Sequence, residues 1–439
     1  MSGNTAALLG FAAMILLIGL RMPIGMAMLV VGAGGYVAMS SLVNFLNYIK
    51  TTPYFLYANY AMTVIPLFIL MGALAEQSGL ARDLFAAARS CLGHRKGGLA
   101  MAVIGACTGF GAICGSSVAT TATFGRSALP ELQRYGYAGS LATGTIAAGG
   151  TLGILIPPSV VLVVYAISTE QNIARLFQAA LIPGLLASLF YCGVIAIVVR
   201  RSPELAPVLK RVPWRERVPA LLAVWPAVTV ALVVLGGIYG GFFTPTEGAS
   251  VGAIAMLVTG VITGKLRADA IRRSLRITAE TTAMILLILL GGEVFNAFLA
   301  LTQMPTNLAE WISGLGLSPP LVLGLLLFSY VLLGAVMDEL AMIILTLPVF
   351  FPLVQALDFG IPSDEVAIWF GILVLIVVGI GLTAPPIGLN VFVISAIARG
   401  VSINETYRGV LPYVAADFVR LLLVFLMPIL AIGMVRWLE

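Results

Sequence analysis

The chain has 439 residues, of which 60% are hydrophobic and only 10% are charged, and its mean hydropathy of +1.07 lies far outside the range of soluble domains. This composition predicts a polytopic membrane protein. The small excess of 24 basic over 19 acidic residues is not gathered on a soluble module, which excludes nucleic acid as a partner.

Apolar runs of a length that crosses a bilayer recur along the chain. In the first half they lie near 5–20, 24–40, 62–78, 138–168 and 175–199. In the second half they lie near 220–239, 246–263, 277–301, 366–397 and 411–436. Two more apolar segments, 98–127 and 319–356, are too long for one span and too interrupted for two, so we expect each to be a re-entrant hairpin. The sequence therefore predicts an all-α membrane protein with about ten spanning helices and two hairpins.

Basic residues predict the orientation of these spans. They concentrate in three clusters, at 82–96, 200–217 and 265–276, which the positive-inside rule places in the cytoplasm. This arrangement requires both termini to lie outside. It also makes the first hairpin open to the cytoplasm and the second to the exterior.

Prolines recur at matching positions in the two halves. The matching positions are Pro23 and Pro245, Pro130 and Pro352, both 222 residues apart, and the pairs Pro157-Pro158 and Pro385-Pro386, which are 228 apart. Five crossings in each half would invert the second half relative to the first, as in many secondary transporters. We expect a first inverted repeat at 1–200, a basic cytoplasmic linker at 201–218 and a second repeat at 219–439.

Four interruptions by small residues fall at comparable places in the two repeats. They lie at 115–117, 149–158, 334–338 and 379–386. Glycine and proline leave backbone carbonyls without helical partners, and these carbonyls and nearby hydroxyls are hard oxygen ligands of the kind that Na⁺ binds. The N-termini of the half-helices favour an anionic carboxylate.

These interruptions predict one sodium site in each repeat. The first site comprises Ser116, Ser117, Gly150 and Thr151. The second comprises Gly334, Asp338, Thr383 and Asn390. The residues predicted to contact the solute are Ser117, Thr120, Pro157, Pro158, Pro385 and Pro386. Na⁺ is the coupling ion, and no cofactor or other metal is indicated.

The alternative interpretation is that the interruptions are kinks at which small residues let helices pack closely. Four motifs in symmetric positions favour binding sites over that alternative. Thr121, Thr123 and Ser159 are expected to be packing residues, or hydroxyls bonded to their own helix, and are left out of the predicted sites.

Ionisable residues inside apolar segments are functional candidates, because a charge in hydrocarbon is costly. Asp338 and Glu339 lie at the second hairpin turn, where a carboxylate can bind a cation. Glu293 is either a coupling residue or the partner of a neighbouring helix. Asp417 and Arg420, three residues apart, are expected to form an internal ion pair.

Five motifs together resemble the large membrane subunit of the tripartite ATP-independent periplasmic (TRAP) transporters, within the ion-transporter superfamily. They are IPLFILMG at 65–72, SGLARDLF at 78–85, GSSVATTAT at 115–123, GTLGILIPPS at 150–159 and TAPPIGLNVFV at 383–393. The resemblance implies inward transport of a carboxylate-bearing solute with sodium. It also implies a scaffold and an elevator-type transport domain that contains both hairpins.

The resemblance further implies two protein partners in the bacterial inner membrane and periplasm. One is a small four-helix membrane subunit, expected as a separate chain because the sequence begins where the large subunit would begin and shows no extra N-terminal spans. The other is a periplasmic binding protein that delivers the organic acid, of C4-dicarboxylate or sugar-acid type.

Two other functions are considered. A stand-alone sodium- or proton-coupled carboxylate carrier of the same superfamily would need no binding protein. An intramembrane enzyme would use Ser116 or Ser117 as its nucleophile, but the chain offers no intramembrane histidine or lysine as the base. We therefore expect a transporter and not an enzyme.

Overall fold

The computed structural model describes residues 2–438, and every regular element within them is a helix. The first half contains α1 (Gly3–Gly19), α2 (Ile24–Met39), α3 (Leu42–Tyr57), η1 (Tyr60–Thr63), α4 (Val64–Gln77), α5 (Leu80–Leu92), α6 (Gly98–Cys114), α7 (Ser117–Ser127), α8 (Leu129–Arg134), α9 (Gly139–Leu155), α10 (Val160–Ser168) and α11 (Ile173–Arg201). The prediction of an all-α chain is confirmed.

The second half follows a linker that contains the short η2 (Pro203–Leu205). It contains α12 (Trp214–Leu222), α13 (Trp225–Tyr239), α14 (Pro245–Ile262), α15 (Ala268–Thr302), α16 (Met304–Gly314), α17 (Pro319–Gly334), α18 (Glu339–Gln355), α19 (Ser363–Gly381), α20 (Leu389–Ile397), α21 (Ile403–Leu426) and α22 (Ile429–Leu438). Proline often marks a helix start, and at α14 Thr244 and Glu247 also form a reciprocal capping box.

Six helices within residues 2–438 are long and apolar enough to cross a membrane. There are eight such spans if the bent pairs α9–α10 and α12–α13, which turn by 43° and 45°, each count as one. The apolar α1 and α2 have 17 and 16 residues, so they lie at or just below the usual length of a span. These helices show a multi-pass membrane protein with six to eight spans among the described residues, and the predicted total of about ten stays a prediction that depends on α1 and α2.

Both segments predicted to form hairpins consist of two helices joined by a short turn. In the first segment α6 and α7 have 17 and 11 residues, and in the second α17 and α18 have 16 and 17. In each segment a broken helical pair follows, α9–α10 in the first half and α19–α20 in the second.

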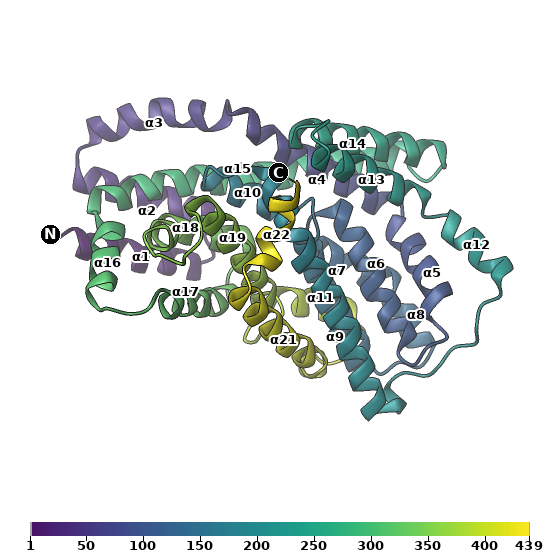
Figure 1. Cartoon of the computed structure of the whole chain (residues 1–439). Helices are drawn as coiled ribbons and strands as arrows, with labels where there is room; N and C mark the ends of the chain where they lie inside the picture. Colours follow the sequence, from purple (N-terminus) through teal and green to yellow (C-terminus); the bar gives the residue numbers. More distant parts are fainter. Residues whose placement is uncertain (1, 439) are drawn as a thin grey trace.

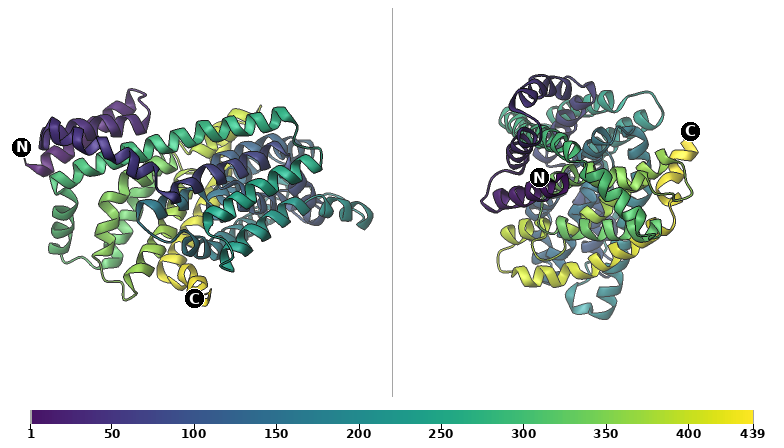
Figure 2. Two further views of the ribbon diagram at one scale, coloured as in Figure 1. Left: turned by 90° about the horizontal axis from the view of Figure 1, so that it is seen from above. Right: turned by 90° about the vertical axis from the view of Figure 1, so that its left-hand side faces the viewer.

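The helices pack in two groups. We call α1, α2, α4, α13, α14 and α15 the α15 bundle, because α15 packs along α2 and α4 while α14 packs on α4 and α13. Figure 1 shows α3 and α14 along the upper edge of the molecule with α15 beneath α3, and Figure 2 shows the long helix α15 crossing much of the molecule's length. A Cβ on Gly291 would lie 2.2 Å from the carbonyl oxygen of Gly25, so glycine lets α15 approach α2 closely.

The second group, which we call the hairpin bundle, comprises α6, α7, α9, α10, α11 and α17 to α21. Its centre is formed by α9 and α19. In α9 every residue from Leu141 to Leu155 is buried, and in α19 89% of the most apolar 18-residue stretch is buried. In the outer helices α11 and α21 only 33% of the corresponding apolar stretch is buried. The break that ends α9 is buried from Ile156 to Ser159, in a place where irregular backbone is tolerated at membrane depth. In the break that ends α19, by contrast, Pro385, Pro386 and Ile387 are exposed.

Candidate functional site

The first hairpin turns at Gly115 and Ser116. Gly115 has a left-handed backbone (φ +66°), and a Cβ there would lie 2.9 Å from the carbonyl oxygen of Pro158. The Ser116 hydroxyl then caps α7 by accepting a hydrogen bond from the amide of Ala119 at 3.4 Å. The tip of the hairpin is thereby placed against the break between α9 and α10.

The second hairpin turns between Gly334 and Asp338. The Asp338 carboxylate caps α18 by accepting hydrogen bonds from the amides of Leu340 at 3.2 Å and Ala341 at 3.4 Å. A Cβ on Gly381, the last residue of α19, would lie 2.6 Å from the carbonyl carbon of Gly334. This tip is therefore also placed against the break of the following helix.

The two close approaches use matching glycines of the broken helices. A Cβ on Gly153 of α9 would lie 2.5 Å from both the carbonyl oxygen of Ser116 and the hydroxyl of Thr120. Gly153 and Gly381 are 228 positions apart, the same separation as the two Pro-Pro pairs. Each hairpin tip thus meets its broken helix at the same place in the element order.

Asn390, on α20 of the second half, reaches across to the first site. Its Nδ2 donates hydrogen bonds to the Ser117 hydroxyl at 2.7 Å and to the Ala147 carbonyl at 3.1 Å. The side chain is fully buried, and its Oδ1 has no hydrogen-bond partner among residues 2–438. An unsatisfied buried oxygen of this kind is costly unless it has a ligand.

Thr121 supplies a second oxygen of this kind. Its hydroxyl is buried and has no hydrogen-bond partner among the described residues. A Cβ on Gly150 would lie 1.8 Å from this hydroxyl and 3.1 Å from Asn390 Nδ2, so glycine at this position lets both side chains approach α9. The expectation that Thr121 serves in packing or bonds its own helix missed this unsatisfied oxygen.

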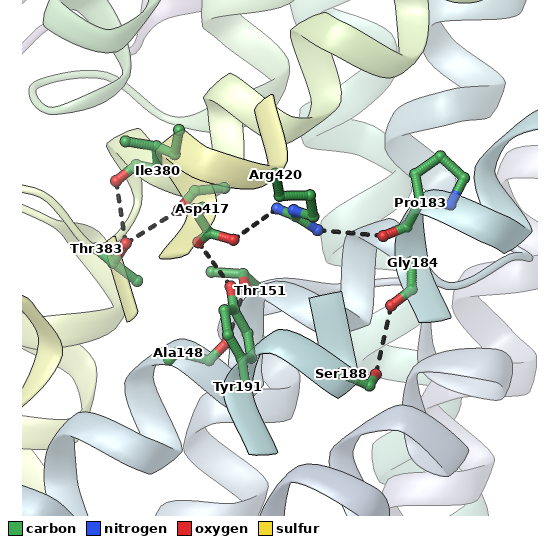
Figure 3. A network of polar contacts seen from close by, with 11 residues as sticks. Ala148, Thr151, Pro183, Gly184, Ser188, Tyr191, Ile380, Thr383, Asp417 and Arg420 are labelled. Atoms are coloured by element: carbon green, nitrogen blue, oxygen red, sulfur yellow. Dashed lines mark hydrogen bonds and ion pairs between the residues drawn. The ribbon is translucent and has the colours of Figure 1, made fainter. Parts of the chain in front are cut away.

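Thr151 belongs to a buried polar network that joins α9 to α11 and α21 (Figure 3). Its hydroxyl hydrogen-bonds the Ala148 carbonyl at 2.7 Å and shares a 2.9 Å contact with the Tyr191 hydroxyl. The Tyr191 hydroxyl donates to Asp417 Oδ2 at 2.7 Å, and Asp417 Oδ1 lies 2.8 Å from Arg420 Nη2. The predicted ion pair between Asp417 and Arg420 is confirmed.

Thr383 lies close to this network but bonds differently. Its hydroxyl donates to the carbonyls of Gly379 at 3.2 Å and Ile380 at 3.0 Å, both on its own helix. A Cβ on Gly379 would lie 3.6 Å from Cβ of Thr151, so the two broken helices touch at this level. Residues predicted for the two separate sodium sites are therefore neighbours.

The predicted solute contacts divide into a buried and an exposed set. Ser117, Thr120, Pro157 and Pro158 are buried, whereas Pro385 and Pro386 are exposed. The Thr120 hydroxyl is buried and donates to the Ser116 carbonyl at 2.7 Å. Pro158 lies against Gly115, as described above, and the Pro386 carbonyl accepts a hydrogen bond from the Tyr407 hydroxyl at 2.9 Å. Pro157 and Pro385 precede these residues in the two breaks.

A small cavity lies between the two hairpins and the α15 bundle. It holds about 110 Å³ of space for water, and we call it the inner cavity. It is lined by Ile69, Gly72, Ala73, Glu76, Cys114, Gly115, Ser116, Ala119, Val160, Val161, Ile277, Thr281, Ile285, Glu339 and Leu340. Glu339 is 7% exposed, and its Oε2 has no hydrogen-bond partner among the described residues. The structure thus brings a buried carboxyl group from the second hairpin to the tip of the first.

Glu293 lies apart from this site. It is exposed on α15 and borders a separate cavity of about 420 Å³ between α15 and α18. The Tyr48 hydroxyl donates to the backbone carbonyl of Glu293 at 3.3 Å. The Glu293 carboxyl group also interacts with the Tyr48 side chain on α3, which fits pairing with a neighbouring helix, while the coupling role stays a prediction.

Comparison with known proteins gives a consistent result. Residues 11–430 match the family model described as "Tripartite ATP-independent periplasmic transporter, DctM component". The chain is 37% identical to the C4-dicarboxylate TRAP transporter large permease protein DctM of Pseudomonas aeruginosa, over 87% of each protein. It is 29% identical to the sialic acid TRAP transporter large permease protein SiaM of Vibrio cholerae, over 84% of this chain and 85% of that protein.

A solved structure with a similar fold is that of the Alcanivorax borkumensis YdaH transporter. The TM-score is 0.62 over 87% of this chain and 88% of that one, at 16% sequence identity. At this identity the likeness concerns the fold alone.

Proposed function

Because the chain belongs to the family of the DctM component of tripartite ATP-independent periplasmic transporters, we propose that it takes up a carboxylate-bearing organic solute together with Na⁺. Members of this family are transport permeases, so the prediction that the chain is not an enzyme is confirmed. Family membership also implies a periplasmic binding protein and a small membrane subunit as partners. It favours a tripartite system over a stand-alone carrier.

The observation that carries sodium coupling is a pair of unsatisfied buried oxygens, the Thr121 hydroxyl over Gly150 and Asn390 Oδ1, from the packed helices α7 and α20. Asn390 Oδ1 and the Thr121 hydroxyl lie with the Ser117 hydroxyl where the first hairpin meets α9. Neutral oxygens gathered from several helices suit a hard monovalent cation. We assign the first sodium site to Ser116, Ser117, Gly150 and Thr151, and we add Thr121 and Asn390 to it.

The second sodium site is proposed at the second hairpin. It comprises Gly334, Asp338 and Thr383, with Asn390 between the two sites. The Asp338 carboxylate would supply a negative charge that the first site lacks. The solute would bind between the tips, near Ser117, Thr120 and the two Pro-Pro breaks, with its carboxylate facing the N-termini of the half-helices.

The solute is proposed to be a C4-dicarboxylate or a sugar acid. Three of the similar proteins, from Pseudomonas aeruginosa, Vibrio cholerae and Rhodobacter capsulatus, are named as C4-dicarboxylate transporter subunits. The relative named for sialic acid carries a solute of the second kind.

Transport is proposed to follow an elevator mechanism in an inverted repeat. Repeats at 1–200 and 219–439, joined by a basic linker at 201–218, account for the recurring order of hairpin and broken helix. The hairpin bundle would move against the α15 bundle, which would form the scaffold with a small four-helix subunit. The positive-inside rule places the basic clusters in the cytoplasm and both termini in the periplasm of an inner-membrane protein.

Uptake into proteoliposomes tests the proposal. The chain, its small subunit and its binding protein are supplied with radiolabelled succinate or N-acetylneuraminate under an inward Na⁺ gradient. We expect accumulation of one of these solutes that collapses when K⁺ replaces Na⁺. Full accumulation without Na⁺ would overturn sodium coupling, and uptake that does not change when the binding protein is left out would favour the stand-alone carrier.

A further inference from the structure

A second cavity adjoins the inner cavity on the side where the basic clusters lie. This outer cavity has a volume of about 700 Å³. It is lined by Glu76, Gln77, Ser78, Gly79, Ala81, Arg82, Asp83, Thr123, Arg126, Ser127, Lys265 and Ile277. Glu76 and Ile277 line both cavities, so a solute that leaves the hairpin tips toward this side passes Glu76.

An ion pair stands at this junction. Arg126, in the last turn of α7, places Nη2 2.8 Å from Oε1 of Glu76, near the end of α4. It connects the returning arm of the first hairpin with the α15 bundle. Ser117 and Thr120, which are proposed to contact the solute, lie near the start of the same helix.

The Arg126–Glu76 pair has the properties of a contact that can be exchanged. The Arg126 side chain is 62% exposed, so its guanidinium group is open to solvent and to an incoming anion, whereas the Glu76 side chain is only 18% exposed. The hydrogen bond to Glu76 uses only Nη2 of the guanidinium group. A guanidinium group binds a carboxylate best through two parallel hydrogen bonds, which this contact does not provide.

The outer cavity also has the charge that an anion requires. Its charged lining residues within the described chain are three cations, Arg82, Arg126 and Lys265, and two carboxylates, Glu76 and Asp83. Lys265 is paired with Asp83, as Arg126 is with Glu76. One positive charge remains in excess, which attracts an anionic solute.

We propose that Arg126 is a transient binding site for the carboxylate of the solute, and that Glu76 is its built-in competitor. The solute carboxylate displaces Glu76 from Arg126 as it leaves the inner cavity, and Glu76 returns to Arg126 as the solute departs. No bond is made or broken except hydrogen bonds and ion pairs. This inference rests on the proposed uptake of a carboxylate.

Opposite effects of two substitutions test the proposal. The full chain in lipid nanodiscs is titrated with succinate as the probe, and binding is followed by saturation-transfer difference NMR. Glu76→Gln removes the competitor at constant size, and we expect the affinity for succinate to rise about 3- to 5-fold. Arg126→Gln removes the cation, and we expect the affinity to fall about 5- to 10-fold.

If the Arg126–Glu76 pair only holds α7 against α4, the two substitutions give a different result. Both substitutions break the same pair, so they would shift the affinity in the same direction, and that outcome overturns the proposal. A rise for Glu76→Gln also cannot come from a misfolded protein. In the double variant Glu76→Gln/Arg126→Gln we expect the low affinity of Arg126→Gln.

Lys265→Gln is the matched control, since it removes one positive charge from the same cavity. We expect its effect to stay below about 2-fold, because Lys265 is held by Asp83. If Lys265→Gln lowers the affinity for succinate as much as Arg126→Gln does, the anion is attracted by the overall positive charge of the cavity and not by a site at Arg126. Sodium-dependent succinate binding that is equal in all variants removes the Arg126 site alone. If the wild type and Glu76→Gln bind neither succinate nor N-acetylneuraminate, the carboxylate proposal is removed as well.

Discussion

The two hairpin tips perform the same structural task with different chemistry. Ser116 and Asp338 are 222 positions apart, and each caps the helix that returns from its hairpin. The first cap is a neutral hydroxyl and the second is a carboxylate. The two halves thus repeat a backbone geometry while their side chains diverge, so two equivalent places need not bind a cation with equal strength.

The surroundings of the two tips differ as well. Behind the first tip, Thr151 continues into the buried network of Tyr191, Asp417 and Arg420. Behind the second, Thr383 bonds only carbonyls of its own helix. We therefore expect the first tip to depend on distant residues and the second to depend on its own acid.

Breaking the network should have the largest effect. Asp417→Leu leaves the guanidinium of Arg420, which is 0% exposed, without its counter-charge. Removing one partner of a buried pair costs about 3–5 kcal/mol, and unfolding of the purified protein in detergent measures the loss. We expect no substitution at the second tip to cost as much stability.

The double variant Asp417→Leu/Arg420→Leu is the control for this prediction. Replacing both charges with apolar groups should recover most of the stability, because no charge then remains buried. Equal losses in the single and double variants would show that Asp417 stabilises the fold by some contact other than its ion pair.

Neutralising the second cap should have the next largest effect. Asp338→Asn keeps an acceptor for the amides of Leu340 and Ala341 but removes the charge. If the carboxylate binds sodium, the Na⁺ concentration for half-maximal uptake rises about 10-fold or more. Ser116→Ala at the first tip loses only a hydroxyl cap, and we expect the Na⁺ concentration for half-maximal uptake to rise about 2- to 5-fold. Wild-type sodium dependence in Asp338→Asn would reduce Asp338 to a helix cap.

The sequence predicts the framework of this comparison well. The proline separations and the interrupted apolar runs located both hairpins and both broken helices, because these features depend on local backbone preferences. The spacing of Asp417 and Arg420 predicted their ion pair, since residues three apart share one helix face.

Contacts between distant segments were beyond the sequence. Asn390 was assigned to the second site, yet its amide bonds Ser117, 273 residues away, because α20 packs on α7 and α9. The unsatisfied hydroxyl of Thr121 was missed because a threonine in a helix commonly bonds its own backbone. The pair of Arg126 and Glu76 depends on how the two bundles meet, which no local pattern encodes.

Filling the space beside Gly150 should weaken the first site alone. In Gly150→Ala the new methyl group would lie 1.8 Å from the Thr121 hydroxyl, so Thr121 must shift. We expect the Na⁺ concentration for half-maximal uptake to rise about 5-fold, as for the loss of one ligand worth about 1 kcal/mol.

Gly379→Ala is the matched substitution in α19. Its methyl group would lie 3.6 Å from Cβ of Thr151, an ordinary van der Waals contact. We expect less than about a 2-fold change in sodium dependence, because no proposed ligand moves. Equal effects of the two alanines would remove the case for a cation beside Gly150.

The smallest predicted effect tests whether the buried network influences sodium binding at the first site. Tyr191→Phe removes the hydroxyl that links Thr151 to Asp417 but keeps the ring. Tyr413→Phe is the control, because its equally buried hydroxyl bonds the neutral Thr145 at 2.7 Å. Each loss should cost about 1 kcal/mol of stability. Only Tyr191→Phe should also raise the half-maximal Na⁺ concentration, by about 2- to 3-fold, since Thr151 loses the partner that orients its hydroxyl. Equal sodium dependence in both variants would show that the network only stabilises the fold. Neither tip would then depend on distant residues for sodium binding.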